Sequence, residues 1–155
     1  MKRIKLTFAD RELEFTDRDT ALAQISQWAE KGTYSVHVIY GPEGCGKTAF
    51  LKQAKAVLEE EFGYHVVYVN PLAEKLEEVL QYTPTVKELV EKALGAFPEQ
   101  WARAVDVAIT VANWAIKKFN KPKVAVLMDD IFQAVGLDKA EVYVKTLLNL
   151  IEWPP

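Results

Sequence analysis

The sequence predicts an α/β fold of three layers, in which helices cover both faces of a mainly parallel sheet. The first observation is that residues 34–40, rich in β-branched and aromatic side chains, run into a glycine-rich segment at 41–48 and then into helix formers. The second is that the apolar runs 64–69 and 124–128 have the length and composition of buried strands. Strand, helix and strand within about 35 residues form a right-handed crossover, which makes the two strands parallel.

Length and composition favour one cytoplasmic domain. The chain has 155 residues, 50% of them apolar, so we expect a single domain over 1–155, with its core at 33–153 and a hairpin and helix at 1–32. The net charge of −3 gives no overall reason to expect a nucleic acid or an anionic membrane as partner. Cys45 is the only cysteine, which excludes an intrachain disulfide and fits a reducing cytoplasm. No signal peptide is recognisable, and the longest apolar run, 107–116, is about half the roughly 20 residues that span a bilayer.

The N-terminal residues predict a hairpin followed by an amphipathic helix. Residues 2–15 alternate weakly on either side of a polar turn, which favours a short hairpin. Thr16 or Asp17 is expected to cap a helix over 18–31 that ends at Gly32. One face of this helix is apolar and comprises Leu22, Ile25 and Ala29.

The remaining sequence is mainly helical. Residues 72–119 predict three helices, separated by breaks at 83–84 and 95–98. The third of these is apolar almost all round, so it is either buried within the fold or associates with a protein partner. Asp138 and Glu141 match a capping box that begins a last helix.

The glycine-rich segment 41–48 fits the phosphate-binding pattern of Gly, four free positions, Gly, Lys and Ser or Thr. Glycines let backbone N–H groups turn inward around an anion, and the following helix adds the positive end of its dipole. Lys47 is predicted to reach the β- and γ-phosphates, and the Thr48 hydroxyl to take one place on Mg²⁺. A glycine-rich turn without a ligand has no need of Lys-Thr at this spacing. The predicted binding residues are Gly41, Pro42, Glu43, Gly44, Cys45, Gly46, Lys47, Thr48 and Ala49.

A second constellation follows the apolar run 124–128, which ends in Asp129 and Asp130. Ligands of α/β proteins lie beyond the carboxyl ends of parallel strands, so these carboxylates are predicted to serve the phosphate site. Asp129 would hold Mg²⁺ through a water, and Asp130 would orient or deprotonate the attacking water. The predicted catalytic residues are therefore Lys47, Asp129 and Asp130, and the metal ligands are Thr48 and Asp129. For both acids the alternative is a pair of carboxylates that opens a turn.

With these residues placed, the chain resembles the archaeal ATPase family of the P-loop NTPases, near the AAA+ and signal-transduction branches. The resemblance rests on residues 15–18 before a helix that ends at 28–32, on the loop 41–48, and on 127–130. It covers most of residues 12–153. The resemblance implies the three-layer αβα core of P-loop NTPases.

The resemblance also implies that Phe15 and Arg18 lie beside the adenine. Relatives commonly carry Asp-Glu where this chain has Asp129 and Asp130, so the second carboxylate stands farther from the water. Family members have a further strand between the phosphate-loop strand and the acidic strand, and they receive an arginine finger from a later region, whereas this chain has no arginine beyond Arg103. We therefore expect an incomplete core whose sheet has a gap or a substitute strand order.

The predicted function is Mg-ATP binding with hydrolysis of the γ-phosphate, coupled to a conformational change. ATP rather than GTP follows from the resemblance and from the absence of an Asn-Lys-x-Asp guanine signature. One alternative is a nucleotide-dependent switch that binds ATP with little turnover; another is a small-molecule kinase, although no arginine-rich lid is visible. A protein partner or self-association is compatible with the sequence. The lysines within 117–123 favour a solvated turn over a nucleic-acid contact.

Overall fold

The computed structural model describes residues 3–8, 10–14, 18–33, 35–96, 103–119 and 123–152. The chain divides into two compact units, which are described separately here. The first unit comprises Met1–Thr33 and His37–Gly63, and the second comprises Tyr34–Val36 and Tyr64–Pro155. In the described part of the chain, none of the helices combines the length and apolar character needed to cross a bilayer.

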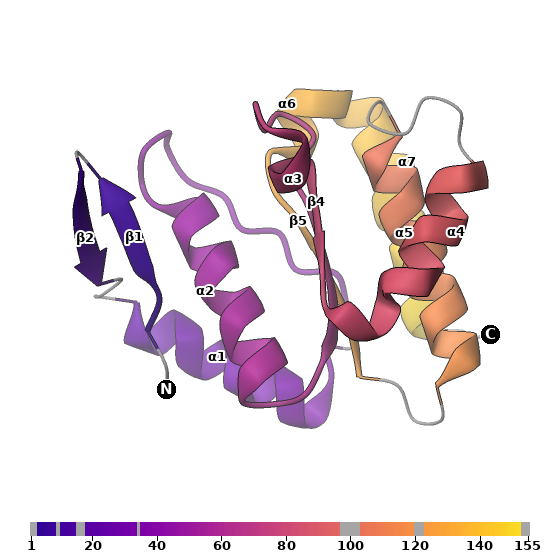
Figure 1. Ribbon diagram of the computed structural model, residues 1–155, viewed down its shortest axis with the longest axis horizontal. Helices are drawn as coiled ribbons and strands as arrows, with labels where there is room; N and C mark the ends of the chain where they lie inside the picture. Colours follow the sequence, from indigo (N-terminus) through magenta and orange to yellow (C-terminus); the bar gives the residue numbers. More distant parts are fainter. Residues whose placement is uncertain are drawn as a thin grey trace. The chain divides into compact units, whose positions relative to one another are not determined.

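The first unit contains the predicted hairpin. Strands β1 (Lys5–Phe8) and β2 (Arg11–Glu14) pair antiparallel, and Asp10 in the turn between them takes a positive φ of 59° (Figure 1). The backbone N–H of Ile4 donates a hydrogen bond to Oε1 of Gln53, a buried residue of helix α2 (Lys47–Glu60). This bond attaches the start of the hairpin to the helix that follows the glycine-rich loop.

Two helices complete the first unit. α1 (Asp19–Lys31) buries the predicted apolar face and ends at Gly32, and it packs against α2 (Lys47–Glu60). The predicted caps at residues 16 and 17 lie outside the described residues. Arg18 stands before the first helical residue, and its side chain does not cap the helix.

The second unit is built on a three-stranded sheet in the order β4-β3-β5. β3 (His65–Val69) pairs parallel with β5 (Val124–Met128) and antiparallel with β4 (Leu80–Tyr82). The prediction of a mainly parallel sheet is therefore wrong, since one of the two pairings is antiparallel. β4 occupies the far edge of β3, and residues 35–40 do not join the sheet, so the expected gap or substitute strand order beside the phosphate-loop strand stays a prediction.

Helices α4 (Lys87–Ala96) and α5 (Ala104–Lys118) lie on one face of this sheet (Figure 1). α5 packs against β3 and β5, and α4 packs on α5. The buried residues of α5 include Val107, Ala108 and Val111, each with no exposed surface. Of the two interpretations of this apolar helix, burial within the fold is thus the one the structure supports.

One strand prediction and one helix prediction fail for the same reason, which is the presence or absence of a partner strand. Residues 35–40, predicted as a core strand, pair with no strand, and Tyr40 is 90% exposed; residue 34 lies outside the described residues. Conversely, β4 was predicted as helix, and it directly follows the short helix α3 (Leu76–Val79). Strand formation depends on a partner backbone more than on the side chains of the strand itself.

The segment after β5 also differs from prediction. A short helix α6 (Ile131–Val135) precedes α7 (Leu137–Glu152). The Gly136 carbonyl accepts the first helical hydrogen bond of α7 from Ala140, so Asp138 lies inside the first turn and the predicted capping box does not form there. The Glu141 carboxylate instead pairs with Lys145 at 2.7 Å.

Candidate functional site: a glycine loop and a buried carboxylate

The start of α2 has the properties of an anion-binding helix end. Gly46 takes a left-handed conformation, with φ 88° and ψ 22°, that turns the chain so that the helix begins at Lys47. α2 has no side-chain cap at this end and no acidic residue in its first turn. Its first backbone N–H groups and the positive end of its dipole are therefore not neutralised by a carboxylate of the helix itself. Thr48 and Ala49 follow within this first turn and are partly buried.

The glycine-rich loop curls around the ammonium group of Lys47. The Nζ atom of Lys47 donates to the carbonyl oxygens of Gly41 and Pro42, both at 2.9 Å, and lies 3.8 Å from the Cys45 Sγ. A Cβ atom at Gly41 would lie 2.9 Å from that sulfur, so any larger residue there would displace the Cys45 side chain. The first and last parts of the 41–48 motif are thus joined through one lysine side chain.

A second cation lies against the same loop. The Arg18 Nη2 donates to the carbonyl oxygen of Cys45 at 2.6 Å. The segment that leads into the loop is also attached to α1, since the rings of Trp28 and His37 stack at 4.1 Å between centroids. Phe15 lies outside the described residues, and contact of Arg18 with an adenine stays a prediction.

The other predicted loop residues, Pro42, Glu43 and Gly44, are exposed. Their predicted contribution to a ligand site comes from their backbone groups, because none of their side chains is buried. The structure therefore brings together Arg18, Lys47 and the backbone of 41–46 in the first unit.

The acidic pair lies in the second unit, at the carboxyl end of β5. The N–H of Asp129 continues the ladder by donating to the Val69 carbonyl at 2.8 Å. Side chains alternate between sheet faces along a strand, and Val126 and Met128 pack into the core beside α5. Asp129 therefore emerges on the opposite face, where it is only 3% exposed.

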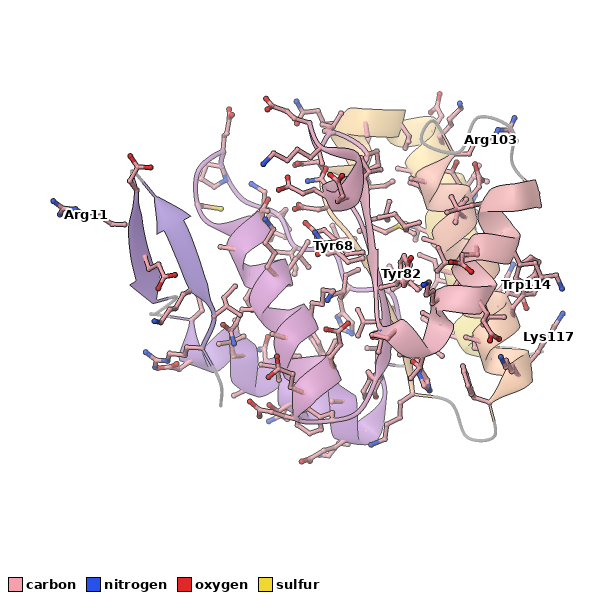
Figure 2. All side chains as sticks on the ribbon, in the orientation of Figure 1. Arg11, Tyr68, Tyr82, Arg103, Trp114 and Lys117 are labelled. Atoms are coloured by element: carbon pink, nitrogen blue, oxygen red, sulfur yellow. The ribbon has the colours of Figure 1, made fainter. Side chains whose placement is uncertain are left out.

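Each oxygen of the Asp129 carboxylate accepts one hydrogen bond. The Tyr68 hydroxyl donates to Oδ2 at 2.8 Å, and the backbone N–H of Asp130 donates to Oδ1 at 3.1 Å. Figure 2 shows Tyr68 and Tyr82 on opposite faces of the sheet, as their strands' register requires.

The proton of this network stays on the tyrosine. Burial raises the pKa of Tyr68 far above its ordinary value of 10.0, and the hydrogen bond and charge of Asp129 raise it further, against a smaller opposing effect from Asn70. Tyr68 is thus a neutral donor at physiological pH. Within the described part of this unit, no Lys, Arg or His forms an ion pair with Asp129.

Asp130 has an unusual backbone conformation for a residue with a side chain. Its φ of 51° and ψ of 24° place it in the left-handed region, which aspartate tolerates better than most residues. Its carbonyl accepts a hydrogen bond from Ala134, so it occupies the N-cap position of α6. The same conformation directs its N–H to the Asp129 carboxylate. Backbone strain of this kind is concentrated at functional sites.

The donor set fits Mg²⁺. A buried carboxylate is stabilised by hydrogen bonds, by a cationic side chain or by a metal ion. Mg²⁺ usually takes one or two protein oxygen ligands and completes its shell with water and phosphate. The described residues hold no group of three or more His, Cys, Asp and Glu that could hold a metal ion.

A glycine loop that opens a helix and a carboxylate that follows a parallel strand are each features of ATPase domains related to the P-loop NTPases. A family model described as an ATPase domain predominantly from Archaea matches residues 15–155. The chain belongs to this family of ATPase domains, as the sequence resemblance predicted. Neither the search of curated proteins nor the search of solved structures returned a match.

Sequence reasoning missed Tyr68. This residue occupies an apolar strand pattern in which a tyrosine is ordinary. The available signal was weak: a phenol in a buried strand requires a hydrogen-bond partner. The identity of that partner depends on the register of β3 against β5, in which Tyr68 lies opposite Leu127.

Proposed function

We propose that the protein binds Mg-ATP at the loop 41–48 and hydrolyses its γ-phosphate by in-line attack of water, with turnover coupled to a conformational change. Lys47 binds the β- and γ-phosphates. Asp130 orients or deprotonates the attacking water. The family match supports nucleotide binding, and the geometry of the loop supports the assignment of the phosphates to it.

The proposal rests on the start of α2. This helix end has no side-chain cap and no acidic residue in its first turn, and the Lys47 ammonium is held inside the loop. The Nζ of Lys47 has two neutral carbonyl acceptors, and phosphate oxygens are stronger, charged acceptors for the same group. Polyphosphate would also satisfy the first N–H groups of α2. An uncharged ligand would use neither feature.

Mg²⁺ would be held by the Thr48 hydroxyl and by Asp129, the latter through a water, and would neutralise charge on the β- and γ-phosphates. Thr48 is in the first turn of α2, immediately after Lys47. Asp129 is held by two neutral donors and retains further lone pairs on both oxygens.

Replacing Asp130 with asparagine is expected to lower phosphate release at least about 100-fold and to leave ATP binding within about twofold of wild type. Asparagine keeps the size of the side chain and tolerates the left-handed backbone, so the variant removes only the carboxylate. Phosphate release and the melting shift with Mg-ATP measure the two properties on the same sample.

Asp138→Asn is the matched control, since it makes the same chemical change at an exposed position on α7. It should retain wild-type phosphate release. Unchanged release in Asp130→Asn would contradict the role of Asp130. Running GTP beside ATP tests the choice of base, which rests on family resemblance.

A nucleotide-dependent switch is the second candidate. It is favoured by the short side chain of Asp130, whose backbone is committed both to capping α6 and to Asp129. A switch shows the full melting shift with Mg-ATP and no phosphate release. Release above the rate of Lys47→Ala selects the ATPase instead.

A further inference from the structure

We propose that Tyr68 is a positioning residue for the carboxylate that serves the metal: its hydroxyl holds the Asp129 carboxylate in the one orientation that serves Mg²⁺. This inference rests on the proposed Mg-ATP function and adds to it a residue that lies in no phosphate or acidic motif. Tyr68 and Asp129 come from the ends of β3 and β5, which lie side by side in the sheet.

The direction of the hydrogen bonds follows from their chemistry. An ionised carboxylate only accepts, so the single proton of Tyr68 is donated to Asp129 Oδ2. The donor and the acceptor of this hydrogen bond therefore each have one fixed role.

This network determines the orientation of the carboxylate. Asp129 is held at Oδ2 by the tyrosine and at Oδ1 by the Asp130 N–H, so rotation about χ2 would break both bonds. Each oxygen keeps one lone-pair direction that neither donor uses. Groups that hydrogen-bond to a metal ligand fix its geometry, and their loss typically lowers metal affinity 10- to 100-fold.

A purely structural role predicts something different. If the hydroxyl only satisfied buried polar groups, its removal would lower the melting temperature and leave the Mg²⁺ dependence of nucleotide binding unchanged. The test must therefore measure metal dependence separately from stability and from turnover.

The experiment measures binding of a fluorescent ATP analogue to wild type, Tyr68→Phe and Tyr82→Phe, first in EDTA and then across a MgCl₂ titration. Tyr68→Phe is expected to bind the analogue in EDTA within about twofold of wild type. Its midpoint in Mg²⁺ should be higher by about 10-fold or more. Tyr82→Phe removes a hydroxyl from the opposite face of the same sheet and should titrate like wild type.

Thermal unfolding without nucleotide checks that each variant is folded. A Tyr68→Phe midpoint within twofold of wild type, whether or not the melting temperature falls, overturns the positioning role. An equal rise of the midpoint in Tyr82→Phe overturns it as well, because the effect would not be specific to the hydroxyl that contacts Asp129. Absence of analogue binding by wild type would defeat the proposed function itself, and the inference with it.

Discussion

Replacing Lys47 with alanine is expected to abolish most of the stabilisation that Mg-ATP confers. At an ATP concentration about 100 times the Kd, wild type should gain about 2.7 kcal/mol. The lysine makes charged hydrogen bonds, each worth about 1.5–3 kcal/mol, so its loss should weaken binding about 100-fold. At the same ATP concentration the variant would then gain only about 0.4 kcal/mol.

The measurement is the melting temperature with and without Mg-ATP, together with phosphate release. Without nucleotide, Lys47→Ala should melt close to wild type, because its present acceptors are carbonyl oxygens of the exposed residues Gly41 and Pro42, which water can satisfy. Lys52→Ala is the matched control, since it removes the same charge farther along α2. A full nucleotide shift in Lys47→Ala would exclude the loop as the phosphate site.

Replacing Val111 with aspartate is expected to unfold the second unit. Val111 has no exposed surface and lies in the core between α5 and the sheet. An unpaired carboxylate there costs about 4 kcal/mol or more, which is a large part of the total stability of a domain. Val111→Ala, which removes two methyl groups, should cost only about 2 kcal/mol.

Lys117→Asp is the control for adding a carboxylate to α5. Figure 2 shows Lys117 at the end of the helix, pointing away from the sheet, and it is exposed. The change should cost no more than about 1 kcal/mol, because a negative charge near a helix C-terminus is only mildly unfavourable. Chemical denaturation of the three variants gives the free energies. A folded Val111→Asp would contradict burial of α5 and favour the alternative that this helix faces a partner.

The local features of the fold were predictable because they arise between residues close in sequence. The period of Leu22, Ile25 and Ala29 gave the buried face of α1, and the short apolar runs gave β3 and β5. The helix after the glycine-rich segment was predicted in the same way, and the structure begins it at Lys47, where Gly46 supplies the required backbone conformation. In each case the interactions span only a few residues.

Strand pairing was not predictable in this way. Residues 35–40 have strong β-propensity and form no strand, whereas Leu80–Tyr82 follow a helix and form one, because β3 provides a partner for them. The Thr83 hydroxyl reinforces this edge by accepting from the Val66 N–H at 2.9 Å. The presence or absence of a partner strand cannot be judged from the residues of the segment itself.

For the candidate site, the sequence by itself determined the loop 41–48 and the presence of two carboxylates after an apolar strand. Only the tertiary structure decided that Asp129 is buried and held by Tyr68, and that Asp130 takes a left-handed conformation at the N-cap of α6. The physical reason is distance along the chain: the bond between Tyr68 and Asp129 joins residues 61 positions apart. Its formation depends on the register of two strands, which local propensities do not specify.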